Sequence, residues 1–252
     1  MKTKIRSGYI FALIFGILLL SLSCLAGSDG AQNWYFSSKS QNERPTLPNL
    51  KSPSAKGIGK EEKVLYLTFD AGYENGNVKK IVDILKEKEV CGAFFVLRHF
   101  VDANTELCIE MKKNGNLVCN HTSRHPAISN LSEEDITKEI RGLEAFYHEK
   151  TGYEMDRFFR PPEGVWSERA LDVVEKLGYK TVFWSLAWAD WDNSNQKPPA
   201  YAMEKLTTRV HDGAVILLHP TSETNAKILG DFIDQMKEKG YRFGTLDELW
   251  EG

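Results

Sequence analysis

The chain has 252 residues, of which 42% are hydrophobic and 27% charged, which is enough for one domain with a substantial core. The 32 Lys and Arg residues against 35 Asp and Glu give a net charge of -3, which argues against nucleic acid as the main partner. An aromatic content of 11%, with 6 Trp, excludes a disordered chain.

The N-terminus has the layout of a secretory signal peptide. Lys and Arg residues precede an almost wholly apolar run at 9–22, and small residues follow the run. The alternatives are a retained membrane anchor, for which the run is somewhat short, and lipidation at Cys24. We therefore expect residues 1–26 to contact the secretion machinery or the membrane. The remainder is expected to be extracytoplasmic, either secreted or anchored at the cell envelope.

Residues 27–61 are interpreted as a linker and N-terminal extension, because 37–60 is rich in Ser, Pro, Lys, Asn and Gly. The aromatic patch NWYF at 33–36 is expected to dock on the catalytic domain, which we assign to residues 62–252. The three cysteines after Cys24 fit neither a disulfide framework nor a zinc module. A single bridge between Cys91 and Cys119 is left open.

From residue 62 onward, short apolar runs alternate with segments whose apolar residues recur at helical spacing. In chain order, we expect strands at 64–69, 93–97, 117–119, 157–159, 180–186, 214–218 and 241–243, and helices at 77–88, 104–113, 132–150, 167–177, 201–210 and 224–239. This alternation predicts an α/β fold with a parallel sheet, and about seven units fit a closed or nearly closed (β/α) barrel. An open doubly wound sheet is the alternative, which the lack of a Gly-rich phosphate motif after the first strand disfavours.

Chemically capable side chains follow the expected strands. They are Asp70, His121 with His125, Arg160, Asp190 with Trp191, and His219. Because the carboxyl ends of barrel strands converge on one face, we expect these groups to form one site. The two histidines are four residues apart, a spacing that on a helical turn lets both bind one divalent ion.

Five ordered motifs resemble those of the polysaccharide deacetylases, carbohydrate esterase family 4. They are TFDAG at 68–72, HTSRH at 121–125, RPPEG at 160–164, DW at 190–191 and LLH at 217–219, and the similarity spans 64–250. Finer details resemble the delta-lactam-biosynthetic de-N-acetylases of spore-forming bacteria, namely NW at 33–34, YENG at 73–76 and NQK at 195–197.

The resemblance implies a distorted (β/α) barrel of about seven parallel strands. It also implies hydrolysis of an N-acetyl group on an amino sugar, with Asp70 as the general base. His121 and His125 would hold a divalent metal ion of the zinc, cobalt or manganese class, and His219 would protonate the leaving amine.

The same resemblance implies supporting roles for other residues. Arg160 would pair with Asp70 and keep it ionised, and Asp190 would hydrogen-bond His219 and keep it protonated. The oxyanion would be stabilised by the metal and by a backbone N–H at Glu163. The expected substrate-binding residues are Glu163, Gly164, Trp188, Trp191 and Leu217.

Two positions depart from the family pattern. Ala71 stands where the family has an Asp, or this subgroup an Asn, that ligates the metal, so we expect the ion to be weakly bound. Glu163 stands where the family often has an aromatic residue and the subgroup an Arg.

Three functions remain to be separated. The first is deacetylation of N-acetylmuramic acid in the peptidoglycan glycan strand, leading to muramic delta-lactam in spore cortex. The second is a more general deacetylation of N-acetylglucosamine in peptidoglycan or chitooligosaccharides. The third is a non-catalytic glycan-binding protein, which the presence of both an acid and a base argues against.

Overall fold

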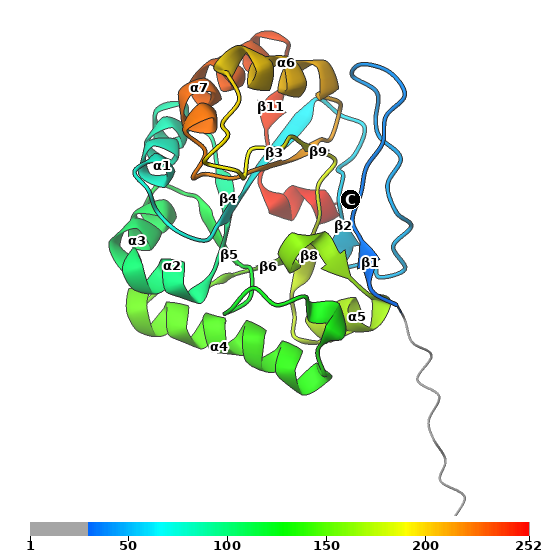
Figure 1. The fold of residues 1–252 in the computed structure, drawn as a ribbon, viewed down its shortest axis with the longest axis vertical. Helices are drawn as coiled ribbons and strands as arrows, with labels where there is room; N and C mark the ends of the chain where they lie inside the picture. Colours follow the sequence, from blue (N-terminus) through cyan, green and yellow to red (C-terminus); the bar gives the residue numbers. More distant parts are fainter. Residues whose placement is uncertain (1–29, 252) are drawn as a thin grey trace, which may run out of the picture.

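The computed structural model describes residues 30–251 (Figure 1). The signal peptide or anchor expected at 1–26 lies outside the described residues. Within 30–251, no helix has both the length and the apolar character needed to cross a bilayer.

One large sheet forms the centre of the molecule. Its strands are β2 (Ala55–Lys56), β3 (Val64–Ala71), β4 (Gly92–Val96), β5 (Leu117–Asn120), β6 (Asp156–Phe159), β8 (Lys180–Val182), β9 (Leu186–Ala187), β10 (Val215–Leu218) and β11 (Arg242–Phe243). Their order is β2-β8-β6-β5-β4-β3-β10-β9, with β11 beside β3, and all of these pairings are parallel. The predicted parallel sheet is confirmed.

The segment 180–187 closes this sheet into a barrel. Its first part, β8, pairs with β6, and after a break at 183–185 its second part, β9, pairs with β10. Just before the break, β2 pairs with the edge of β8 that β6 leaves free, and Ile58 forms a bridge to Ala214. The distorted (β/α) barrel is confirmed, but the single strand expected at 180–186 is wrong, because the chain there changes partners.

Helices surround the sheet (Figure 1). They are α1 (Asn77–Glu87), α2 (Arg98–Ala103), α3 (Thr105–Lys113), α4 (Glu133–Thr151), α5 (Glu168–Lys176), α6 (Pro199–Arg209) and α7 (Glu223–Glu238), with short 3-10 turns η1 (Ile128–Asn130), η2 (Pro162–Gly164) and η3 (Leu246–Trp250). The side chains of Ser132, Ser167 and Ser222 cap α4, α5 and α7 by accepting backbone N–H bonds. Only α2 among the α-helices in the described residues was not predicted.

The alternation of side chains along β3 separates the core from the site. Leu65, Leu67, Phe69 and Ala71 belong to the apolar cluster shared with the helices. The residues between them face the barrel interior, where Val64 and Tyr66 pack with Phe95 and Val215. Asp70 continues this inner row at the carboxyl end of the strand.

The N-terminal extension packs against the break in the barrel. Strand β1 (Gln32–Asn33) pairs antiparallel with β7 (Val165–Trp166). Trp34 is buried, stacks on Phe183 with ring centroids 4.1 Å apart, and donates its indole N–H to the Trp184 carbonyl at 2.7 Å. Trp34 thus docks as expected, whereas Tyr35 is 60% exposed.

The described cysteines form no disulfide. Cys119 in β5 pairs with Phe95, whereas Cys91 precedes β4 and lies out of register with it. Cys91, Cys108 and Cys119 are all free thiols, and burial raises the pKa of each above its usual value. The bridge between Cys91 and Cys119 that the sequence left open is absent.

Candidate active site

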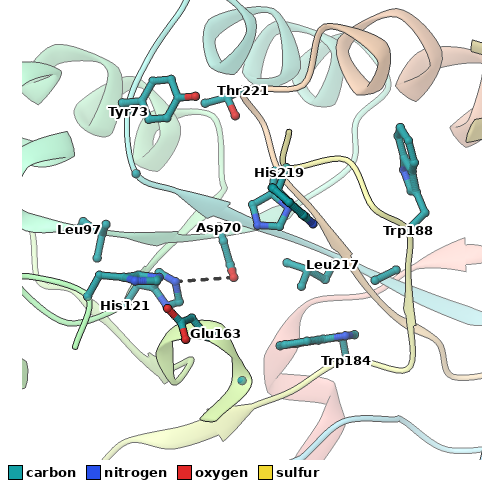
Figure 2. Close-up of a pocket in the computed structure, with 15 residues that line it drawn as sticks. Asp70, Tyr73, Leu97, His121, Glu163, Trp184, Trp188, Leu217, His219 and Thr221 are labelled. Atoms are coloured by element: carbon teal, nitrogen blue, oxygen red, sulfur yellow. Dashed lines mark ion pairs between the residues drawn. The ribbon is translucent and has the colours of Figure 1, made fainter. Parts of the chain in front are cut away.

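A cavity of about 540 Å³ opens at the carboxyl ends of the barrel strands (Figure 2). Its lining residues are Asp70, Gly72, Tyr73, Leu97, His121, His125, Glu163, Gly164, Trp184, Ala187, Trp188, Trp191, Leu217, His219 and Thr221. Every site residue predicted from the sequence lines it except Arg160 and Asp190. Those two are buried behind the cavity, where each contacts a residue that lines it.

Asp70 and Arg160 form a buried ion pair on one side of the cavity. Arg160 Nη1 donates to Asp70 Oδ1 at 2.8 Å, and its Nη2 donates to Thr68 Oγ1 at 2.8 Å. Burial of Asp70 opposes ionisation, but the charge of Arg160, aided by His121 and His219, outweighs it, so the pKa of Asp70 lies below its usual value. The pairing expected from the sequence is present, and it keeps this carboxylate ionised.

His121 follows β5 and presents one ring nitrogen to the cavity. Its Nδ1 lies 2.8 Å from the carbonyl of Arg160, and because a carbonyl only accepts, we assign the proton to Nδ1. The lone pair on Nε2 then faces the cavity, 3.7 Å from Asp70 Oδ2. Burial lowers the pKa of His121 to about 4, so the ring is neutral near pH 7. The His125 ring lies edge-on to it, with centroids 4.9 Å apart.

The turn that carries both histidines is not helical. Thr122 and His125 have φ values of 72° and 65°, in the left-handed region that non-glycine residues rarely occupy. Hydrogen bonds hold the turn, since Asn120 Oδ1 accepts from Thr122 N and Thr122 Oγ1 accepts from His125 N, both at 2.9 Å. The expected helical turn is wrong, because side-chain oxygens rather than an i,i+4 backbone bond close this loop.

The loop after β6 is also strained. Glu163 has a φ of 57° and Gly164 a φ of 67°. A Cβ at Gly164 would lie 2.8 Å from the Trp184 ring and 3.0 Å from the Cβ of Trp34, so only glycine fits between these two side chains. Backbone strain of this kind concentrates at functional sites.

His219 and Asp190 form the other side of the cavity. His219 Nδ1 lies 2.7 Å from Asp190 Oδ1, and the His219 backbone N–H donates to Asp190 Oδ2 at 2.8 Å. Burial of His219 disfavours its charge, but the hydrogen bond and the charge of Asp190, together with Asp70, outweigh burial and raise the pKa of His219. This arrangement favours the imidazolium, which can donate a proton.

The donor set fits a divalent ion that is only partly coordinated by protein. The rings of His121 and His125 lie side by side at the cavity, and neutral imidazole is a good ligand for such ions. Ala71 is fully buried in the apolar cluster and supplies no donor. No third His, Cys, Asp or Glu completes a metal-binding group among residues 30–251.

Sequence reasoning missed several polar residues that support the site. Asn225 on α7 bonds Asp190, and Gln196 Nε2 donates to the carbonyls of Asp190 at 3.0 Å and Asp192 at 2.9 Å. Tyr73 lines the cavity, and its hydroxyl accepts from Asn193. Tyr73 and Gln196 lie in the YENG and NQK segments singled out by resemblance, whereas no pattern pointed to Asn225.

The chain is similar in sequence to known proteins. Residues 57–182 match the profile of the family described as polysaccharide deacetylase. An uncharacterized 30.6 kDa protein of Geobacillus stearothermophilus is 43% identical over 75% of this chain and 71% of that protein. The peptidoglycan-N-acetylmuramic acid deacetylase PdaA of Bacillus subtilis is 41% identical over 75% of this chain and 72% of that protein.

The fold is also similar to that of a solved family 4 carbohydrate esterase. The solved structure of Bacillus subtilis PdaA, a family 4 carbohydrate esterase, matches with a TM-score of 0.84 and 37% identity, over 88% of this chain and 97% of that one. Sequence and fold therefore agree that the chain belongs to the polysaccharide deacetylase family, carbohydrate esterase family 4, and is an enzyme of that kind.

Proposed function

We propose that the enzyme removes the acetyl group from N-acetylmuramic acid in peptidoglycan. The observation that carries this proposal is that an ionised carboxylate, Asp70, and a protonatable imidazole, His219, line the same cavity, each backed by a buried partner of opposite charge. Amide hydrolysis requires both a base and an acid. Similarity to PdaA supports muramic acid as the sugar.

In the proposed reaction, a water molecule attacks the acetyl carbonyl carbon while Asp70 accepts its proton. Breaking the C–N bond then releases acetate, and His219 donates a proton to the departing amine. Arg160 keeps Asp70 charged before the step, and Asp190 balances the charge of His219. The amine so freed would then attack the carbon of the lactyl carboxyl group, whose C–O bond breaks with release of one water, and give the muramic delta-lactam of spore cortex.

A divalent ion held by His121 and His125 would polarise the acetyl carbonyl. The remaining stabilisation comes from the loop at 162–164, whose residues Glu163 and Gly164 line the cavity. We assign the backbone N–H of Glu163 to the developing oxyanion. The walls formed by Trp188, Trp191 and Leu217 would hold the sugar.

We also propose that the enzyme works outside the cytoplasm, secreted or anchored at the cell envelope or forespore cortex. Two observations support this location. Residues 1–26 have the layout of a signal peptide, and peptidoglycan lies beyond the membrane.

The test uses three polymers incubated with protein and added divalent ion: intact peptidoglycan, peptidoglycan stripped of its peptides by an amidase, and chitin oligomers. Mass spectrometry of the products reports loss of acetyl groups, with Asp70→Asn as the blank. We expect good activity on the stripped polymer and poor activity on the other two. Equal rates on chitin oligomers would instead show a general deacetylase, and glycan binding without acetate release would show a non-catalytic protein.

A further inference from the structure

Asn225 lies fully buried in the first turn of α7, beside the side of the cavity that His219 and Asp190 form. Its Nδ2 donates to Asp190 Oδ2 at 2.6 Å and to the His219 carbonyl at 3.1 Å. Its Oδ1 accepts the indole N–H of Trp188 at 3.2 Å. One amide therefore contacts the carboxylate of Asp190, the backbone of His219 and the indole of Trp188 in the cavity wall.

The orientation of this amide is fixed by its partners. A carboxylate and a carbonyl can only accept hydrogen bonds, so Nδ2 must face Asp190 and His219. An indole N–H can only donate, so Oδ1 must face Trp188. Exchanging the two amide atoms would leave both sides unsatisfied.

We propose that Asn225 is a positioning residue that holds the carboxylate of Asp190 against the imidazole of His219 and ties this pair to the cavity wall at Trp188. Asp190 Oδ2 receives two N–H donors, from Asn225 and from the backbone of His219. Both bonds fix the rotamer of the carboxylate, so that Oδ1 faces His219 Nδ1. Mounting the amide on a helix makes this placement rigid.

The charged groups around His219 are few. Asp190 contacts it directly, and Asp70 and Arg160 act on it from across the cavity with opposite signs. Of these, Asn225 bonds only Asp190. Loss of the Asn225 amide should therefore act on His219 by weakening the hold of Asp190 and should leave the Asp70–Arg160 pair in place.

Asn77 offers a matched control. It is a second buried asparagine in the first turn of a helix, α1, and its Nδ2 donates to the carbonyl of Thr221 at 3.1 Å. Both asparagines thus tether the loop after β10 by the same kind of bond at the same distance. Only Asn225 also bonds Asp190.

The experiment follows the titration of His219 by NMR in the enzyme without substrate, with the signal assigned by its loss in His219→Ala. In Asn225→Leu, which removes both the donor and the acceptor, the midpoint should fall by about one pH unit. The alkaline limb of kcat against pH should fall with it, and kcat should drop more than KM rises. Asn77→Leu should lower the melting temperature while leaving the midpoint of His219 where it is.

An unchanged midpoint in folded Asn225→Leu, or an equal shift in Asn77→Leu, would overturn the proposal. If the leucine variant does not fold, Asn225→Ser gives the same reading, because its short side chain cannot reach both Asp190 and Trp188. The kinetic arm rests on the proposed function. The titration needs no substrate, so it would still test the role of Asn225 if the muramic acid assignment failed. Failure of one proposal can therefore be told apart from failure of the other.

Discussion

The side chain of Arg160 is wholly buried and lies 2.8 Å from the carboxylate of Asp70. The same residue uses its backbone carbonyl to orient the ring of His121 at 2.8 Å. Its guanidinium is fixed further by the carbonyl of Val182 at 3.0 Å and by the face of Phe95, 4.3 Å from the ring centroid. One residue therefore favours the charged form of Asp70, the proposed base, and orients the neighbouring imidazole of His121.

Replacing Asp70 with Asn is expected to abolish acetate release while leaving the fold intact. The amide oxygen can still accept from Arg160, but it cannot take a proton from water near neutral pH. Acetate release and the circular dichroism spectrum measure the two effects. Turnover within a few-fold of the natural enzyme would mean that another group is the base.

The rate should fall as pH rises through the pKa of His219. Because the folded protein raises this pKa, the protonated form persists to higher pH than in free histidine, and the acid is lost only above it. Asp190→Asn removes the charge that raises the pKa, so the alkaline limb of kcat should move to lower pH. His219→Ala should slow turnover by roughly two to four orders of magnitude. If Asp190→Asn left the alkaline limb of kcat where it is, His219 would not be the group whose titration causes that limb.

The protein should purify with little tightly bound metal and should need added divalent ion for activity. His121 and His125 are the two neighbouring imidazoles at the cavity, whereas His219 is bonded to Asp190 and Ala71 offers no donor. Calorimetric titration with zinc, cobalt and manganese salts measures the affinity, and His125→Ala should weaken it further. Stoichiometric zinc that survives a chelator would contradict this expectation and would indicate an additional ligand.

Glu163 places a carboxylate at the cavity (Figure 2). Muramic acid without its peptide carries a free carboxylate, so the two negative charges should repel. Glu163→Gln should lower KM for the stripped polymer several-fold, and the gain should shrink in high salt. Uncharged chitin oligomers should respond little, and Glu133→Gln, at the exposed start of α4, serves as the charge-matched control. An equal change on both substrates would argue against the repulsion.

Acid should destabilise the fold through His211. The ring is buried, with Nε2 bonded to Ser185 Oγ at 3.0 Å and Nδ1 to the Arg209 carbonyl at 2.9 Å, and burial lowers the pKa of His211. Below a pH of about 6.5, the unfolded chain gains a proton that the folded ring resists, so stability present above that pH is lost as pH falls. The free energy of unfolding, measured with urea, should therefore change less between about pH 7 and pH 5 in His211→Gln than in the natural protein. The exposed His148→Gln should change nothing, and an equal effect there would contradict the assignment.

Much of the barrel and site could be predicted because the signals were local. Apolar runs in the sequence marked β3 and β10. Each run is followed directly by the polar residue that ends the row of side chains facing the barrel interior, which is Asp70 for β3 and His219 for β10. The convergence of strand ends then placed them together. The same reasoning placed Arg160 and Asp190 next to them.

The missed features depend on contacts between distant segments. The break between β8 and β9 arises where one segment exchanges β6 for β10, which no local pattern records. The left-handed turn at Thr122 and His125 is set by side-chain caps. Asn225 is recognisable only once α7 is packed against the loop that carries Trp188 and Asp190, because its proposed role depends on hydrogen bonds to these two residues.

The break in the barrel gives the N-terminal extension a part in the chemistry. Phe183 lies in this break, and its ring stacks on Trp34. The backbone carbonyls of Phe183 and Val182 accept hydrogen bonds from the guanidinium of Arg160. The chain of contacts thus runs from Trp34 through Phe183 to Arg160 and ends at Asp70. Trp34, which precedes the first core strand, therefore helps to support the proposed general base, and its loss should loosen the ion pair between Arg160 and Asp70.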